Sequence, residues 1–481
     1  MNVSILHISD LHWGRNGSIR HDVLPDSLVN DCRHFSAEEE PRVRAPDVIV
    51  VSGDIIHGID FDVDEPEESL RAQYGGASAF LAGLADRFVS GDRQRVVVVP
   101  GNHDVSSYHL AKSLELIDVP SDRQIPLSDQ LFSLESPFRW SWKELELYRI
   151  CDTSMYRKRM SAFAEFYADF YDGQRHFDLD PADQVEVFDY PELGLTIVGF
   201  SSCYNNDRLK KQGAIHPACI AEVGTRLRER AFASRLRVAA WHHNVEGSPY
   251  RVDYMDPDLL QNLIDRGFSL GLHGHQHRPQ YLSTRFRHEV DRKMTVISAG
   301  TLCGGPGLGH ARSYNVIELC TAARAGRLHV REMQNADGDL PIWGRRVLPT
   351  VGQRYLEFDY DPPPPPVAST GGATPVLMEA QTLHLRGAYR NAADLLTGVL
   401  QRDSLSRPLL LDCLVRLKDA ESIVDLFDPP VSEAEAVHLM DALWETGRRD
   451  RLSELLAQPL VADSDDPSVA EMREKYRARA R

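Results

Sequence analysis

The chain has 481 residues, of which 42% are hydrophobic and 26% are charged, and this balance excludes a disordered chain and a single small module. Its 54 Lys and Arg residues against 71 Asp and Glu residues give a formal net charge of −17, which argues against a general nucleic-acid coat or a binder of anionic membranes. The length predicts two or three domains.

The N-terminus and the cysteines bear on the compartment. Residues 1–10 have no basic segment followed by a long apolar core, and no stretch of about 18 apolar residues occurs in the chain. The seven cysteines are scattered, odd in number and without a CxxC pair, which is typical of free thiols in a reducing compartment. We therefore expect a cytoplasmic protein that does not contact a membrane.

Short apolar runs rich in β-branched residues recur through the first two thirds of the chain, and they end in Gly, Asp, Asn or His. Continuous runs of this kind are typical of strands that are covered on both faces. In chain order they are residues 3–8, 47–51, 95–99, 195–200, 236–241, 268–272, 294–298 and 313–319. Helical segments such as 78–88 lie between the first three runs, so we expect a layered α/β domain over residues 1–360.

Residues 105–180 are rich in aromatic side chains and interrupt the α/β order. Phe163, Phe166, Tyr167, Phe170 and Tyr171 follow a spacing of three and four residues, which places them on one face of a helix. We expect a helical insert that packs this aromatic stripe against the sheet domain. A surface on which nucleic-acid bases stack is the alternative interpretation.

A run of five prolines ends the α/β pattern. The prolines and the Ser- and Gly-rich residues after them predict a linker at residues 361–374. Residues 375–481 are rich in Leu and Ala with helical spacing, and they contain three similar units in which Asn391, Asp419 and Asp450 follow one another after 28 and 31 residues. These units resemble tetratricopeptide-type repeats, with an ordinary helical bundle as the alternative, so we expect an all-α C-terminal domain.

Five of the predicted strands are followed by polar blocks. The blocks are Ser9-Asp10-Leu11-His12, Gly53-Asp54, Gly101-Asn102-His103-Asp104, His242-His243 and Gly274-His275-Gln276-His277. Open α/β sheets bind ligands at the carboxyl ends of their strands, where such blocks converge. Carboxylates, imidazoles and one Asn amide, without thiolates, favour Mn²⁺, Fe or Zn²⁺ and disfavour a structural zinc site of the Cys type.

The five blocks, in this order, resemble those of the calcineurin-like metallophosphoesterase superfamily, and the resemblance covers about residues 1–335. It implies a four-layer α/β/β/α sandwich with two divalent metal ions, Mn²⁺ first among them. By the family pattern, Asp10, His12 and His277 would hold one ion, Asn102, His242 and His275 would hold the other, and Asp54 would bridge both.

The same resemblance implies the catalytic chemistry. A hydroxide bound to the metal ions would attack phosphorus. His103 would protonate or stabilise the leaving oxygen, and Asp104 would orient its imidazole from behind. Either His242 or His243 could face the metal, although His242 is the one that matches the family block.

Other histidines flank these blocks. His7, His57 and His273 are interpreted as packed or hydrogen-bonding side chains, because alternate residues of a strand point away from the pocket.

The family pattern does not choose the substrate. We expect a phosphodiesterase that hydrolyses a small or nucleotide-derived phosphodiester. A DNA or RNA nuclease is the first alternative: Arg208, Lys210 and Lys211 favour it, whereas the net charge and the acidic residues between 60 and 68 oppose it. The second alternative is a scaffold with regulatory phosphoesterase activity that recruits a protein partner through residues 375–481.

Overall fold

The computed structural model describes residues 2–14, 19–61, 63–118, 131, 136–232, 234–247, 253–284, 292–307, 309–335, 340–347, 352–362, 373–398 and 406–479. Its contacts divide the chain into two compact units, Met1–Pro366 and Val367–Arg481. The division falls within the expected linker 361–374, of which residues 363–372 lie outside the described part of the chain.

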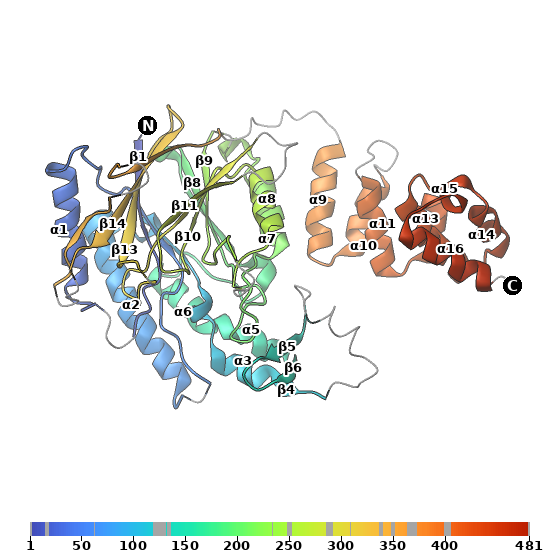
Figure 1. Ribbon diagram of the computed structural model, residues 1–481, viewed down its shortest axis with the longest axis horizontal. Helices are drawn as coiled ribbons and strands as arrows, with labels where there is room; N and C mark the ends of the chain where they lie inside the picture. Colours follow the sequence, from blue (N-terminus) through green and yellow to red (C-terminus); the bar gives the residue numbers. More distant parts are fainter. Residues whose placement is uncertain are drawn as a thin grey trace. The chain divides into compact units, whose positions relative to one another are not determined.

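The first unit is built around two large sheets (Figure 1). The first sheet has the order β15-β14-β13-β1-β2-β3, with β16 paired to β14; its strands are β1 (Asn2–Ile8), β2 (Val48–Ser52), β3 (Val96–Val99), β13 (Ser313–Cys320), β14 (Ala325–Met333), β15 (Trp343–Arg345) and β16 (Leu356–Asp359). The second has the order β11-β12-β10-β9-β8-β7; its strands are β7 (Val185–Tyr190), β8 (Leu195–Phe200), β9 (Leu236–Ala240), β10 (Leu270–His273), β11 (Gln280–Thr284) and β12 (Met294–Ser298). Strands β1, β2 and β3 run parallel, as do β8, β9, β10 and β12.

Alternate residues of the second sheet point into two separate hydrophobic cores. In β8, Leu195 and Ile197 belong to the core that also contains the first sheet, whereas Val198 and Phe200 belong to the core that contains the helices α7 (Pro217–Arg226) and α8 (Pro257–Asp265). The helices α1 (Leu24–Ala37) and α2 (Pro66–Phe88) lie on the other side of the sheets (Figure 1). The expected four-layer α/β/β/α fold is therefore confirmed.

The insert, residues 105–180, contains helices and a third, smaller sheet. The helices are α3 (Ser107–Ser113), α5 (Thr153–Arg157) and α6 (Ser161–Phe170), and the antiparallel sheet has the order β4-β6-β5, with β4 (Leu114–Leu116), β5 (Phe138–Ser141) and β6 (Glu146–Ile150). The aromatic stripe on α6 is buried, and Phe166 stacks on Tyr74 of α2 with ring centroids 4.9 Å apart. The sequence predicts a helical insert, but the insert is not purely helical. Residues 138–141 and 146–150, whose side chains alternate between two faces, form a β-hairpin.

The second unit is all-α, as expected. Its helices are α9 (Ala373–Leu385), α10 (Tyr389–Thr397), α11 (Ser406–Leu417), α12 (Ala420–Phe427), α13 (Glu433–Glu445), α14 (Arg449–Leu456), α15 (Pro459–Ala462) and α16 (Pro467–Arg479). Three successive hairpins, α9–α10, α11–α12 and α13–α14, each turn next to a residue with positive φ, namely Gly387, Lys418 and Gly447. The relation to tetratricopeptide repeats and the recruitment of a partner stay predictions.

Among the described residues, no helix is both long enough and apolar enough to cross a membrane.

Candidate metal centre

The seven expected metal ligands lie directly after five parallel strands. Asp10 and His12 follow β1, Asp54 follows β2, Asn102 follows β3, His242 follows β9, and His275 and His277 follow β10. The loops from the two sheets meet, since the Nε2 atoms of His12 and His277 are 3.0 Å apart although 265 positions separate these residues in the chain. The structure therefore brings all seven side chains together.

The donors fall into two groups. In the first group, His277 Nε2 lies 3.2 Å from Asp10 Oδ1 and 3.0 Å from His12 Nε2. In the second, Asn102 Oδ1 lies 3.1 Å from His242 Nε2 and 2.9 Å from His275 Nδ1. The grouping is the one that the family pattern implies.

Asp54 lies between these two groups. Its Oδ2 atom is 3.7 Å from His12 Nε2 in the first group, and its Oδ1 atom is 3.3 Å from His242 Nε2 in the second. Asp54 is 1% exposed, and its Oδ1 also accepts the backbone N–H of His103 at 2.9 Å. One carboxylate thus presents a separate oxygen to each group.

Backbone carbonyls hold two of the imidazoles by their far nitrogens. His242 Nδ1 is 2.8 Å from the carbonyl oxygen of Ser52, and His277 Nδ1 is 2.5 Å from that of Gly305. An Nδ1–H that donates to a carbonyl fixes the tautomer, so that Nε2 presents its lone pair to the centre. This is the support that metal-ligating histidines receive in proteins.

His242 and not its neighbour points at the centre. His243 is buried, and its Nδ1 bonds to the Ser202 hydroxyl at 2.8 Å. The Ser202 hydroxyl also accepts the backbone N–H groups of both histidines at 3.1 Å. Burial and the nearby His275 and His242 rings lower the pKa of His243 well below its usual value, so this ring is neutral.

The backbone around the centre is strained. Asp10, His12, Asp54, His275 and His277 have φ angles between 46° and 75°, in the left-handed region that side chains other than glycine disfavour. Such strain persists only where the surrounding structure enforces it, and it concentrates at functional sites.

Two glycines permit the close packing of these loops. Gly53 has φ of 93°, and a Cβ atom there would collide with the His242 ring. A Cβ atom on Gly274 would collide with the Ser9 and Asp10 side chains. Gly53 is therefore required by space and by backbone angle, and Gly274 by space.

The charges of the centre depend on one another. Burial acts to lower the pKa of His242, but the Asp54 and Asp10 carboxylates outweigh it and raise the pKa to about 9. Burial likewise acts to lower the pKa of His277, and its bond to Asp10 raises it to about 9. In the absence of cations, protons on imidazoles thus balance the ionised carboxylates, and a cation has to displace them.

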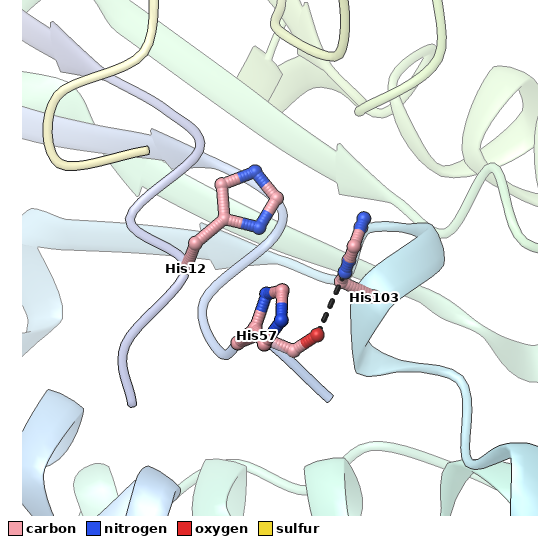
Figure 2. A group of neighbouring side chains, drawn as sticks. All are labelled: His12, His57 and His103. Carbon is pink, nitrogen blue, oxygen red and sulfur yellow. Dashed lines mark hydrogen bonds between the residues drawn. The ribbon is translucent and has the colours of Figure 1, made fainter. Parts of the chain in front are cut away.

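His103 is held differently from the sequence-based expectation. Its Nδ1 atom lies 2.7 Å from the backbone carbonyl oxygen of His57 (Figure 2). The buried Asp104 carboxylate accepts instead the N–H of Gly101 at 2.7 Å and that of Ile55 at 3.2 Å, and the Tyr74 hydroxyl at 3.0 Å. The orienting role expected of Asp104 is therefore wrong: a carbonyl orients the imidazole, and Asp104 fixes the loops after β2 and β3.

His57 is exposed beside the centre, so of the packed or hydrogen-bonding role interpreted from the sequence, the packed one is excluded. Its ring stacks beside that of His103, with centroids 5.6 Å apart, and nitrogens of His12, His57 and His103 lie within 4.8 Å of one another (Figure 2). The position of His57, three residues after Asp54 at the same sheet edge, is the signal that identifies it. His7 and His273 are buried, as interpreted.

Asp253 is a second residue that the sequence does not reveal. Its Oδ2 atom lies 3.3 Å from His275 Nε2, on the side of that imidazole opposite Nδ1, which faces Asn102. This contact places a negative charge beside the imidazole of a proposed ligand. Asp253 lies in no recognisable motif, so only the fold brings it to His275.

A cleft of about 470 Å³ opens beside the centre. Its lining includes His57, Asn102, His103, Arg208, Lys211 and His275. The cleft therefore joins residues of the centre to the basic segment that precedes β9, and its volume lies in the range of ligand sites, about 300 to 1,000 Å³.

Some solved structures of other proteins are similar to this chain at low sequence identity. A dimetal phosphatase from Danio rerio is 11% identical, with a TM-score of 0.40, over 75% of this chain and 99% of its own. A protein from Thermus thermophilus is 11% identical, with a TM-score of 0.32, over 69% of this chain and 99% of its own. Vps29 from Chaetomium thermophilum is 8% identical, with a TM-score of 0.25, over 75% of this chain and 98% of its own. No curated protein matches the sequence.

One family model matches the sequence, that of the calcineurin-like phosphoesterases, over residues 3–279. This range is more than half of the chain and includes every block that contributes a donor to the centre. The chain belongs to the calcineurin-like phosphoesterase family.

Proposed function

We propose that the protein is a phosphodiesterase that works with two divalent cations on a small or nucleotide-derived phosphodiester. The observation that carries the proposal is the position of Asp54, whose two oxygens face His12 and His242 in separate groups of donors. A carboxylate shared in this way is a feature of two-metal hydrolytic sites. Membership in the calcineurin-like phosphoesterase family supports the same chemistry.

The residues present fit divalent cations. The Nε2 atoms of His12 and His277 approach to 3.0 Å, and His242 Nε2 and His275 Nδ1 approach to 3.3 Å. Two nitrogen lone pairs at such distances repel unless a proton or a cation neutralises them. Asp10, His12 and His277 would hold one cation, Asn102, His242 and His275 the other, and Asp54 both. This mixed set of nitrogen and oxygen donors suits Mn²⁺, which we favour, as well as Fe and Zn²⁺.

His103 is the group that we assign to proton transfer. When bound, the two cations supply positive charge to the phosphoryl oxygens and lower the pKa of coordinated water. The His103 Nδ1–H donates to the His57 carbonyl, which holds the imidazole in the cleft, and in the imidazolium form Nε2 carries a second proton. Nε2 gives this proton to the leaving oxygen, so that the product departs as an alcohol.

The wall of the cleft supports a diester over a monoester. Arg208 and Lys211 line the cleft in addition to the donors of the centre, and the volume exceeds what a single phosphoryl group occupies. Asp60 pairs with Arg208 at 2.6 Å, which reduces the positive charge available to a long polyanion. The cleft therefore suits a compact substrate with two substituents on phosphorus.

A panel of substrates tests this function. Purified protein with Mn²⁺ is offered bis-p-nitrophenyl phosphate, p-nitrophenyl phosphate, cyclic nucleotides and single-stranded DNA. We expect the small diesters to have the highest kcat/KM and Asp54→Asn to abolish their hydrolysis. Full activity of Asp54→Asn would exclude the bridging role, and preferred cleavage of DNA with a steep salt dependence would indicate the nuclease instead.

A further inference from the structure

A row of aromatic side chains lies on strand β5 in the insert. Phe138 and Trp140 occupy alternate positions and share one face of the strand, and Trp142 follows in the turn after it. Trp142 is 79% exposed, and its ring centroid lies 5.9 Å from that of Trp140. The buried aromatic stripe on α6 stabilises the fold, whereas this second row is open to a ligand.

The row faces the basic segment that also lines the cleft. A cavity of about 330 Å³ is lined by Phe138, Trp140 and Trp142 from the insert and by Leu209, Lys210 and Lys211 from the segment before α7. Lys211 lines both this aromatic cavity and the 470 Å³ cleft beside the metal centre. A substrate with its phosphate at the centre can therefore extend past Lys211 into the aromatic cavity.

A buried ion pair fixes the two walls relative to each other. Arg139, which points to the opposite side of β5 from Trp140, donates through Nε to Asp207 Oδ2 at 2.6 Å, and both side chains are fully buried. Tyr156 donates its hydroxyl to the same oxygen at 2.9 Å. Asp207 Oδ1 accepts the backbone N–H groups of Leu209 and Lys210, each at 2.9 Å. The cavity is thus a built feature rather than a chance gap between loops.

The aromatic lining of the cavity indicates a ligand with a flat ring. The planes of the Trp140 and Trp142 indoles meet at 83°, so a flat ligand stacks on one of them at a time. Trp142 is 79% exposed and therefore offers its face to the cavity. An acyl chain has no flat face to place there, whereas a nucleobase has one, and Lys211 in the same lining supplies positive charge for the attached phosphate.

Resting on the proposed phosphodiesterase function, we propose that Trp140 and Trp142 form a nucleobase subsite, and that the substrate is a nucleoside-bearing phosphodiester. The base stacks on Trp142, with Trp140 edge to face beside it; Lys211 lies along the path between base and phosphate, and the phosphate lies at the metal centre. Because stacking on aromatic side chains tolerates every base, the subsite selects the presence of a base rather than its identity.

The test compares two monophosphates that differ only in the base. Adenosine 5′-monophosphate and ribose 5-phosphate are titrated into the Mn²⁺-loaded full-length protein by calorimetry. We expect the nucleotide to bind about tenfold or more tightly, the contribution of one base–aromatic stack. Trp140→Leu and Trp142→Leu should each reduce this ratio towards one, and Trp142→Phe should preserve most of it.

Leu116→Ala is the matched control for damage to the small sheet. Leu116 is 55% exposed on β4 and lines neither the cleft nor the aromatic cavity, so the affinity ratio should stay at the wild-type value. Equal affinities for the two monophosphates, or a ratio that survives the Trp140→Leu/Trp142→Leu double variant, would overturn the subsite. Because the readout is binding, failure of the protein to hydrolyse any diester would refute the proposed function without deciding the subsite.

Discussion

The two units of the chain are held together over very different sequence distances. In the first unit, His12 and His277 meet across 265 positions, and the metal centre exists only when both sheets have formed. In the helical unit, ion pairs join residues that are 27 to 29 positions apart, such as Arg390 with Asp419, Arg407 with Glu435, and Arg448 with Glu421. A single substitution in the metal centre should therefore abolish the function of the first unit. A single substitution in the helical unit should disturb only the neighbouring helices.

The largest expected effect concerns His103 in the first unit. His103→Ala should lower kcat on a small diester by about 10² to 10⁴, the usual contribution of general acid catalysis, while two cations still bind per chain. Steady-state kinetics together with metal analysis measure both quantities. Arg390→Ala in the helical unit is the control and should leave kcat unchanged. Loss of cations from His103→Ala would show that the imidazole is a ligand and not an acid.

Removal of the cations should lower the thermal stability of the first unit and not that of the second. Cations at about 100 times their dissociation constant stabilise the unit that binds them by about 2.7 kcal/mol. A chelator should therefore lower the melting temperature of residues 1–366 and leave that of residues 367–481 unchanged, as seen in scanning calorimetry. Equal shifts of both transitions would mean that the units unfold together.

Cation binding in the first unit should release protons, which the helical unit does not do. His242 and His277 have a raised pKa of about 9 in the cation-free centre, so both carry a proton at pH 7. A cation needs neutral imidazoles, so its affinity should rise with pH up to about 9, by about tenfold per pH unit for each proton displaced. Calorimetric titration in buffers of different ionisation enthalpy counts the protons. Binding without proton release would contradict the charge balance of the centre.

The smallest expected effects lie within the helical unit. Arg407 makes two hydrogen bonds with the buried Glu435, so Arg407→Met should destabilise this unit by about 2 kcal/mol. Arg448→Met removes an exposed pair with Glu421 and should cost less than about 1 kcal/mol. Urea unfolding measures both. Neither variant should alter phosphodiester hydrolysis. Loss of hydrolysis in either variant would contradict the expectation that substitutions in the helical unit affect only that unit.

The sequence predicts the parts of the first unit that depend on side-chain type. Runs at 3–8, 47–51 and 95–99 coincide with β1, β2 and β3 to within one residue, because buried parallel strands are continuously apolar. The ligand blocks can be recognised for a related reason, because polar residues directly after a buried apolar strand indicate a functional site. The pattern also predicts helices throughout the second unit.

Features that depend on the backbone or on contacts between distant residues cannot be predicted from side-chain type. The partner of the His103 imidazole is a carbonyl group, which every residue possesses, so the sequence favoured the neighbouring Asp104 incorrectly. The contact of Asp253 with His275 joins residues that are 22 positions apart and depends on tertiary packing rather than on local sequence. The sequence does not predict the sheet in the insert, because the helical spacing of the aromatic stripe on α6 is the strongest pattern in residues 105–180.

The left-handed backbone at five of the seven proposed ligands has a consequence for protein engineering. A screen for heat resistance alone would reward glycine at Asp10, His12 or Asp54, because glycine adopts those backbone angles without penalty. The resulting variants would be thermally more stable but catalytically inactive. Thermostabilisation of this enzyme therefore has to select for turnover in every round, or to leave these positions untouched.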